Sequence, residues 1–108
     1  MDEARPERRA HERLRLPLEA RWEGQAGAHE AHVQDLSPGG CYIESDGQVN
    51  DGERVTIRVR TPAGVWLVIH GAVAHHQPRK GFGVLFLPLA PAARYQLEDT
   101  IRSARGDK

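Results

Sequence analysis

The chain has 108 residues, a formal net charge of zero and a single cysteine, Cys41. This length is typical of one compact domain. A neutral chain argues against a protein that coats nucleic acid or lies on an anionic membrane, because both usually carry a basic excess. One cysteine excludes an internal disulfide and a cysteine-based zinc set, and it favours a reducing cytoplasmic location.

The N-terminal residues are charged, contain Pro6 and have no steady apolar period. We therefore expect a flexible arm over residues 1–12. They lack the apolar stretch of a secretory signal, and the longest apolar run, Val65 to Ile69, is too short to cross a bilayer, so no membrane insertion is expected. Basic residues gather here: five arginines and two glutamates between positions 5 and 15 give a local net charge of +3. Such a cluster in a neutral chain suits a small anion better than a long polyanion.

A strand signal begins at Arg13, where apolar residues occupy every even position from Leu14 to Trp22. This period of two predicts a half-buried strand with Trp22 in the core. Further strands are expected over about residues 28–34, 41–44, 55–60, 65–75 and 82–86, separated by glycine- and proline-rich turns. The strand over 65–75 is apolar on both sides in its first half, which favours burial on two faces.

The last element is a helix over Ala92 to Arg105, where Ala93, Leu97, Ile101 and Ala104 form an apolar stripe. Six short strands followed by one helix predict a mostly β domain over residues 13–105, a six-stranded antiparallel barrel with a C-terminal helix.

Two motifs carry the chemistry. The first is Arg8-Arg9-Ala-His-Glu-Arg13, just before the first strand, and the second is Asp35-Leu-Ser37-Pro-Gly39-Gly40, at a turn between strands. Arginine presents a planar fork of donors that pairs with phosphate or with the O6 and N7 atoms of guanine. A carboxylate accepts from guanine N–H groups, a serine hydroxyl serves base or phosphate, and glycine lets a ligand approach the backbone. Together these groups can recognise a guanine nucleotide, without specifying which one.

The chain resembles the PilZ family, whose members pair Arg-x-x-x-Arg with a downstream Asp/Asn-x-Ser-x-x-Gly motif. Here these are Arg9 to Arg13 and Asp35 to Gly40, and the stretch from Gly81 to Phe86 resembles the family's closing strand. The resemblance implies a stand-alone cyclic di-GMP receptor in which Arg8, Arg9 and Arg13 fold over the ligand. It also implies contacts from the barrel side, and the residues expected to make them are Asp35, Ser37, Gly39 and Gly40.

A planar residue that flanks the outer guanine is also typical of the family. His75, His76 and Arg79 are the candidates, and His76 is included in the expected site. Either one or two cyclic di-GMP molecules could bind.

Other functions find less support in the sequence. No nucleophile–base arrangement, phosphate-binding loop or paired carboxylates indicate an enzyme. The six histidines lack a convincing third ligand for a metal site. Two alternatives stay open: a PilZ-fold adaptor that contacts proteins without the nucleotide, and a small barrel that binds RNA or DNA, which the few aromatic residues disfavour. A protein partner is expected in either PilZ case, with pilus, flagellar or polysaccharide machinery as candidates.

Overall fold

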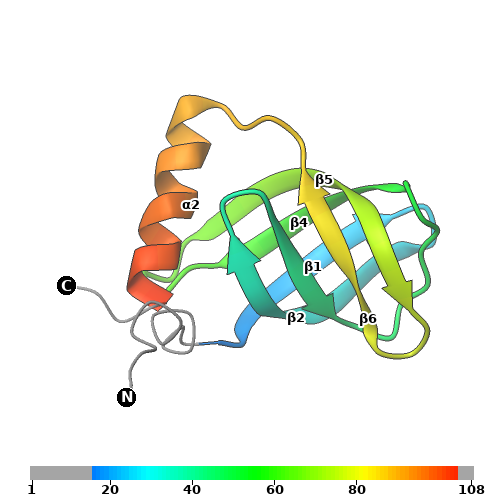
Figure 1. Ribbon diagram of the computed structural model, residues 1–108. Helices are drawn as coiled ribbons and strands as arrows, with labels where there is room; N and C mark the ends of the chain where they lie inside the picture. The colour runs from blue at the N-terminus through cyan, green and yellow to red at the C-terminus, as the bar shows by residue number, and fades with distance from the viewer. Residues whose placement is uncertain (1–15, 105–108) are drawn as a thin grey trace, which may run out of the picture.

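A computed structural model describes residues 16–104 of the chain. Six antiparallel strands form a closed barrel in the order β1-β2-β3-β6-β5-β4, and one helix follows (Figure 1). The strands are β1 (Leu18–Gly24), β2 (Gly27–Ser37), β3 (Gly40–Glu44), β4 (Arg54–Arg60), β5 (Trp66–Gln77) and β6 (Gly81–Phe86), and the helix is α2 (Pro91–Ala104). This architecture confirms the predicted fold class.

The core fills the barrel with side chains from alternate strand positions. Trp22, Ile43, Ile57, Ile69 and Phe82 are each 0% exposed. The Trp22 ring stacks on His29, with ring centroids 4.7 Å apart, and meets Phe82 edge to face. Its indole N–H donates to Ser45 Oγ over 3.1 Å, which satisfies the one polar group that this large residue buries. The prediction that Trp22 belongs to the core is confirmed.

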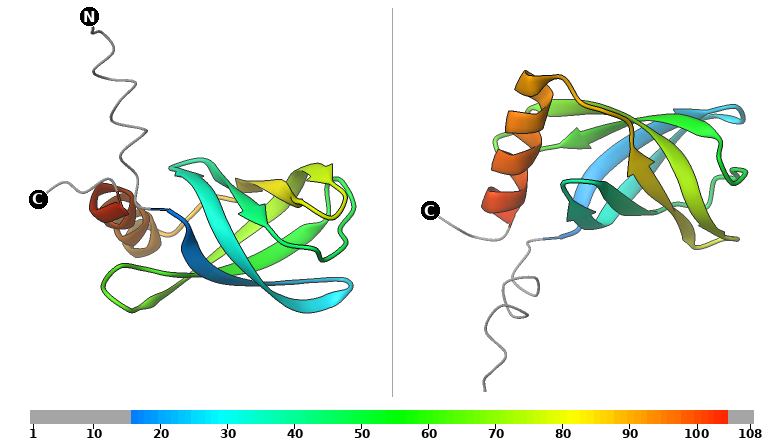
Figure 2. Two further views of the ribbon diagram at one scale, coloured as in Figure 1. Left: turned by 90° about the horizontal axis from the view of Figure 1, so that it is seen from below. Right: turned by 45° about the horizontal axis from the view of Figure 1, so that its top comes forward.

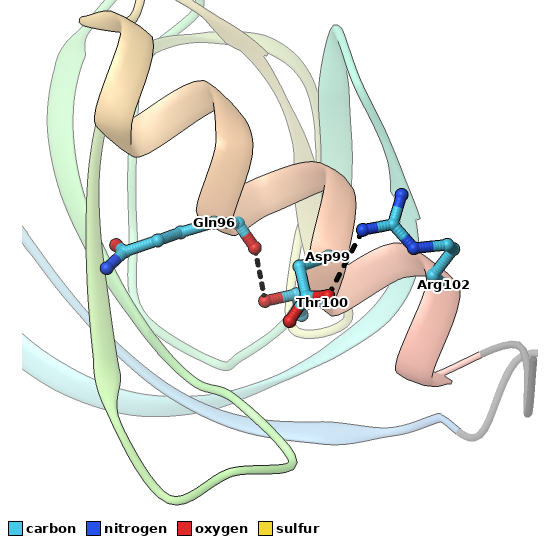
Figure 3. Close-up of polar contacts among 4 residues, drawn as sticks. All are labelled: Gln96, Asp99, Thr100 and Arg102. Carbon is cyan, nitrogen blue, oxygen red and sulfur yellow. Dashed lines mark hydrogen bonds and ion pairs between the residues drawn. The ribbon is translucent and has the colours of Figure 1, made fainter. Parts of the chain in front are cut away.

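Helix α2 stands at one end of the barrel, beside the hairpin that joins β4 to β5 (Figures 1 and 2). Leu97, Ile101 and Ala104 are buried and Ala93 is half-buried, so the predicted apolar stripe is confirmed. Thr100 is buried as well, and its hydroxyl donates to the carbonyl of Gln96 over 2.8 Å (Figure 3). The helix therefore covers an end of the barrel that would otherwise expose core residues to water.

Three strand boundaries differ from those predicted by more than one residue. β1 begins at Leu18, not near Arg13: Leu16 and Pro17 precede it, and residues 13–15 lie outside the described residues. Pro17 has no N–H to donate to a ladder, which is consistent with a start just after it. β2 continues through Ser37 and does not stop at Gln34. β5 extends to Gln77 beyond the predicted end at residue 75.

Burial of β5 on two faces was also predicted, and it is wrong. Inward and outward positions alternate along the strand: Leu67 and Ile69 are buried, but Val68 between them is 42% exposed. The outward apolar residues of β5 are therefore part of the protein surface.

No helix among residues 16–104 is long and apolar enough to span a bilayer. In the same part of the chain, no three His, Cys, Asp or Glu side chains gather in a way that could hold a metal ion.

Candidate ligand-binding site

The second motif spans the hairpin between β2 and β3. Asp35 and Ser37 are exposed at the end of β2, Pro38 and Gly39 form the turn, and Gly40 begins β3. A two-residue turn allows the two strands to pair directly, with Ser37 opposite Gly40. The motif therefore continues the sheet instead of interrupting it.

A β-bulge decides where the motif side chains point. Ala31 and Val33 face the core, so strict alternation would also turn residue 35 inward. The pairing of β2 with β3 shifts between Val33 and Asp35, which leaves Gln34 as the extra residue. Leu36 then fills the next inward position and is 4% exposed. Asp35 and Ser37 consequently lie together on the outer face of the barrel.

The two glycines of the motif have different surroundings. A Cβ atom added to Gly40 would lie 2.5 Å from the carbonyl oxygen of Val84, so the close pairing of β3 and β6 requires glycine here. A Cβ atom on Gly39 would meet nothing within 4 Å. The Gly39 carbonyl accepts from the Phe86 amide over 2.9 Å, and the Ser37 hydroxyl donates to the Gly40 carbonyl over 3.2 Å. These contacts hold the turn in place.

The strand register places the motif in two rows that cross four strands on the outer face, since residues directly opposite each other share a face. One row contains Asp35, Tyr42, Gly83 and His75. The next contains Ser37, Gly40, Leu85 and Ala72. These rows give the motif a surface of mixed acidic, hydroxyl, aromatic and apolar character.

Cys41 lies between these rows, on the side of the strand that faces the core. Burial, and secondarily the nearby carboxylate of Asp35, raises the pKa of the Cys41 thiol to about 12. Both effects disfavour the thiolate. Cys41 is therefore a neutral packing residue beside the site.

Shallow depressions lie on either side of the motif surface. One, of about 330 Å³, runs from Pro38 and Gly39 to Arg94, Leu97 and Glu98 of helix α2. It connects the turn of the motif directly to the helix.

The second depression, of about 620 Å³, is lined by acidic Glu44 and Asp46 together with basic Arg79 and Lys80. Its opposing charges give it no net preference for an anion.

The remaining predicted site residues fall in two groups. Arg8, Arg9 and Arg13 lie outside the described residues, so the structure leaves their approach to Asp35 and Ser37 a prediction. His76 is half-buried opposite Phe82, and its Nε2 atom is buried without a hydrogen-bond partner among residues 16–104. A second bulge, between Val73 and His75, turns His75 to the outer face in its place.

Tyr42, Gly83 and Leu85 were not predicted as site residues. Their sequence signal was the alternation of β3 and β6, which identifies outward positions but not which strands become neighbours.

Comparisons with known proteins agree with this fold. The family model of the PilZ domain matches residues 7–103. Among curated proteins, no relative with significant sequence similarity was found.

Three solved structures share the fold. The PilZ domain of CeSA from a cellulose-synthesizing bacterium is 13% identical, with a TM-score of 0.65 over 83% of this chain and 94% of that one. The Bacillus subtilis inhibitor of motility (MotI/DgrA) is 15% identical, with a TM-score of 0.68 over 87% of this chain and 49% of that one. The Borreliella burgdorferi PlzA protein in complex with c-di-GMP is 14% identical, with a TM-score of 0.62 over 94% of this chain and 38% of that one.

The chain thus spans about half or less of the latter two proteins, and at these identities the likeness concerns the fold alone. The family match covers nearly the whole sequence, including both motifs and all six strands. This chain belongs to the PilZ domain family.

Proposed function

We propose that this chain is a cyclic di-GMP receptor. The observation that carries the proposal is the exposed pair Asp35 and Ser37, turned to one face by the bulge in β2. The carboxylate accepts from guanine N–H groups, and the hydroxyl bonds base or phosphate. Gly39 and Gly40 supply backbone that a ligand can approach closely.

Arginines of the first motif provide the complementary charge. Cyclic di-GMP carries two phosphates, and the barrel side of the site contributes an acidic residue, so cations must come from elsewhere. Arg8, Arg9 and Arg13 precede β1, and the family match begins at residue 7 and includes them. Each good bidentate arginine contact with guanine contributes about 1–3 kcal/mol of discrimination.

The proposal extends to how the signal is read. Binding orders residues 1–12 over the barrel, and a protein partner recognises the ordered state. Comparison of amide spectra with and without cyclic di-GMP tests this step, with the largest changes expected from Arg8 to Arg13. Unchanged spectra in that segment at saturating ligand would contradict the relay but not the binding.

Titration calorimetry with cyclic di-GMP tests the binding. Arg9→Ala, Arg13→Ala and Asp35→Ala should each weaken binding about ten- to a hundredfold, at tenfold per 1.4 kcal/mol. Arg58→Ala is the matched control, because Arg58 lies on β4, outside both motifs, and pairs with Glu23 over 3.5 Å. Absence of heat with the wild type at micromolar ligand would refute the proposal and favour a protein-binding adaptor instead.

Of the three candidates for the planar residue beside the outer guanine, Arg79 lies in the turn after β5, and the two histidines lie on the strand itself. His76 is the one expected from sequence, but the register favours His75, which shares its row with Asp35. Single His75→Ala and His76→Ala variants separate them, because only the residue that contacts the base should weaken binding without lowering stability.

A further inference from the structure

A glycine-rich strip lies on the outer face of the barrel beside the motif hairpin. The outward positions of β6 are Gly81, Gly83 and Leu85, and those of β3 opposite them are Glu44, Tyr42 and Gly40. Three of these six positions are glycines. Since an outward strand position usually carries a side chain, each of these glycines requires a physical reason.

The fold explains two of the three. A Cβ atom on Gly40 would lie 2.5 Å from the Val84 carbonyl oxygen, and a Cβ atom on Gly81 would collide with the carbonyl oxygen of Ile43. Gly83 differs, because its Cβ atom would come no closer than 3.9 Å to anything, and that neighbour is His75. Gly83 is also not one of the glycines with a positive φ angle. The barrel can therefore accommodate a Cβ atom at position 83.

Side chains surround Gly83, which is half-buried. The Tyr42 hydroxyl donates to Gln77 Oε1 over 2.7 Å. Because Tyr42 pairs with Gly83 and Gln77 pairs with Gly81, this bond crosses β6 where Gly81 is buried and bounds Gly83 on one side. Leu85 bounds it on the other side and is 61% exposed, although it is a large apolar residue. His75, opposite Gly83, is exposed on β5.

We propose that Gly83 is the floor of a purine subsite, on which the flat face of one guanine of the bound dinucleotide rests, with Leu85 against the edge of the ring. This inference rests on the proposed cyclic di-GMP function. Neighbouring strands are about 4.8 Å apart, so Gly83, two strands from Asp35, lies about 10 Å from it across the sheet. One nucleotide spans that distance. A missing Cβ lets the ring reach van der Waals contact with the backbone, and Leu85 gains from losing water.

Substitution at Gly83 separates this role from a structural one. Gly83→Val should weaken cyclic di-GMP binding at least about tenfold, because the side chain holds the ring away from the backbone. Its melting temperature should stay equal or rise, since valine suits a strand better than glycine. Leu85→Ser should weaken binding in the same direction. The matched control is Ala28→Val on β2, an exposed outward position far from the hairpin, which should change neither quantity.

A spectroscopic measurement on the wild type provides an independent readout. A purine stacked on Gly83 shields the protons beneath its ring, so the Gly83 Hα signals should move upfield on addition of cyclic di-GMP. If the wild type binds, but Gly83→Val binds equally well or the Gly83 Hα signals do not move upfield, the subsite is overturned and the receptor function stands. If the wild type fails to bind cyclic di-GMP, the receptor function and the purine subsite are both refuted.

Discussion

At the scale of single residues, the site depends on two inward-facing side chains, Leu36 and Cys41, that lie beside the exposed Asp35. Leu36 occupies the inward position that Asp35 would otherwise take, and Cys41 packs opposite it. The carboxylate is thus held outside by the packing of its neighbour. The same proximity acts on the cysteine, whose thiol is buried next to a negative charge.

Cys41 should therefore react slowly with thiol reagents. Its pKa of about 12, against 9.0 for an ordinary cysteine, makes the thiolate roughly a hundredfold to a thousandfold scarcer than in the unfolded chain at about pH 8. The rate of iodoacetamide alkylation, native against urea-unfolded, measures this. Asp35→Asn should accelerate the native reaction, because the carboxylate contributes to the raised pKa. Equal native and unfolded rates would contradict the burial of the thiol.

The sign of the pH dependence follows from the same shift. Because the folded chain holds the thiol proton more tightly, the contribution of Cys41 to stability is complete below about pH 9 and is lost as the pH rises toward about 12. The advantage of the wild type over Cys41→Ala in unfolding free energy should shrink across that window.

At the scale of elements, the loop from Ser45 to Glu53 is held by a buried carboxylate. Glu53 is 8% exposed. One oxygen accepts from the amide of Gln25 over 2.7 Å and the other from the amide of Asn50 over 2.9 Å. A single side chain thereby joins the turn between β1 and β2 to the loop that precedes β4.

Glu53→Gln should destabilise the domain by about 1–3 kcal/mol. The amide group of glutamine keeps only one acceptor, so one of the two partly buried backbone N–H groups loses its acceptor and faces the NH2 donor instead. Urea unfolding gives the magnitude, and faster hydrogen exchange at Gln25 or Asn50 identifies the lost bond. Glu44→Gln is the control, since Glu44 is exposed and accepts from the side chain of Gln34. Equal losses of unfolding free energy in the two variants would contradict the role of the Glu53 carboxylate in joining the turn to the loop.

At the scale of the whole molecule, helix α2 and the barrel share one core. Leu97 is 1% exposed and belongs to the same hydrophobic cluster as the strand residues. The helix also borders the depression that reaches the Pro38–Gly39 turn. Its docking therefore contributes to the stability of the barrel end that presents the motif.

Leu97→Ala should lower the free energy of unfolding by about 2–5 kcal/mol, a large part of the roughly 5–15 kcal/mol typical of a domain. Tyr95→Ala, on the same helix but at a residue that is 67% exposed, should change it by less than about 0.5 kcal/mol. Urea denaturation measures both. Similar midpoints for the two variants would show that the helix is not part of the cooperative core.

The sequence predicted where the strands and the helix lie along the chain better than it predicted which strands become neighbours in space. Alternation located the strands, and the apolar stripe located the helix face, because both are local periodicities. The bulge at Gln34 becomes apparent only when β2 is paired with β3. The outward orientation of Asp35 could therefore not be predicted without the strand register. The same holds for His75 and His76, whose faces are exchanged by the bulge in β5. Nothing in the sequence distinguishes Gly83 from another strand glycine, because only the strand pairing places Tyr42 beside it on the same face as Leu85.

Closure of the barrel limits how another protein can recognise this domain. Each of the six strands between Leu18 and Phe86 has a hydrogen-bonded neighbour on both sides over at least part of its length, since β1 pairs with β4 as well as with β2. Capture by strand addition, a common route to peptide recruitment, needs an unpaired backbone edge. Along the stretches that are paired on both sides, a binding protein must therefore recognise side chains and turns, and point substitutions on the barrel exterior there will alter its specificity.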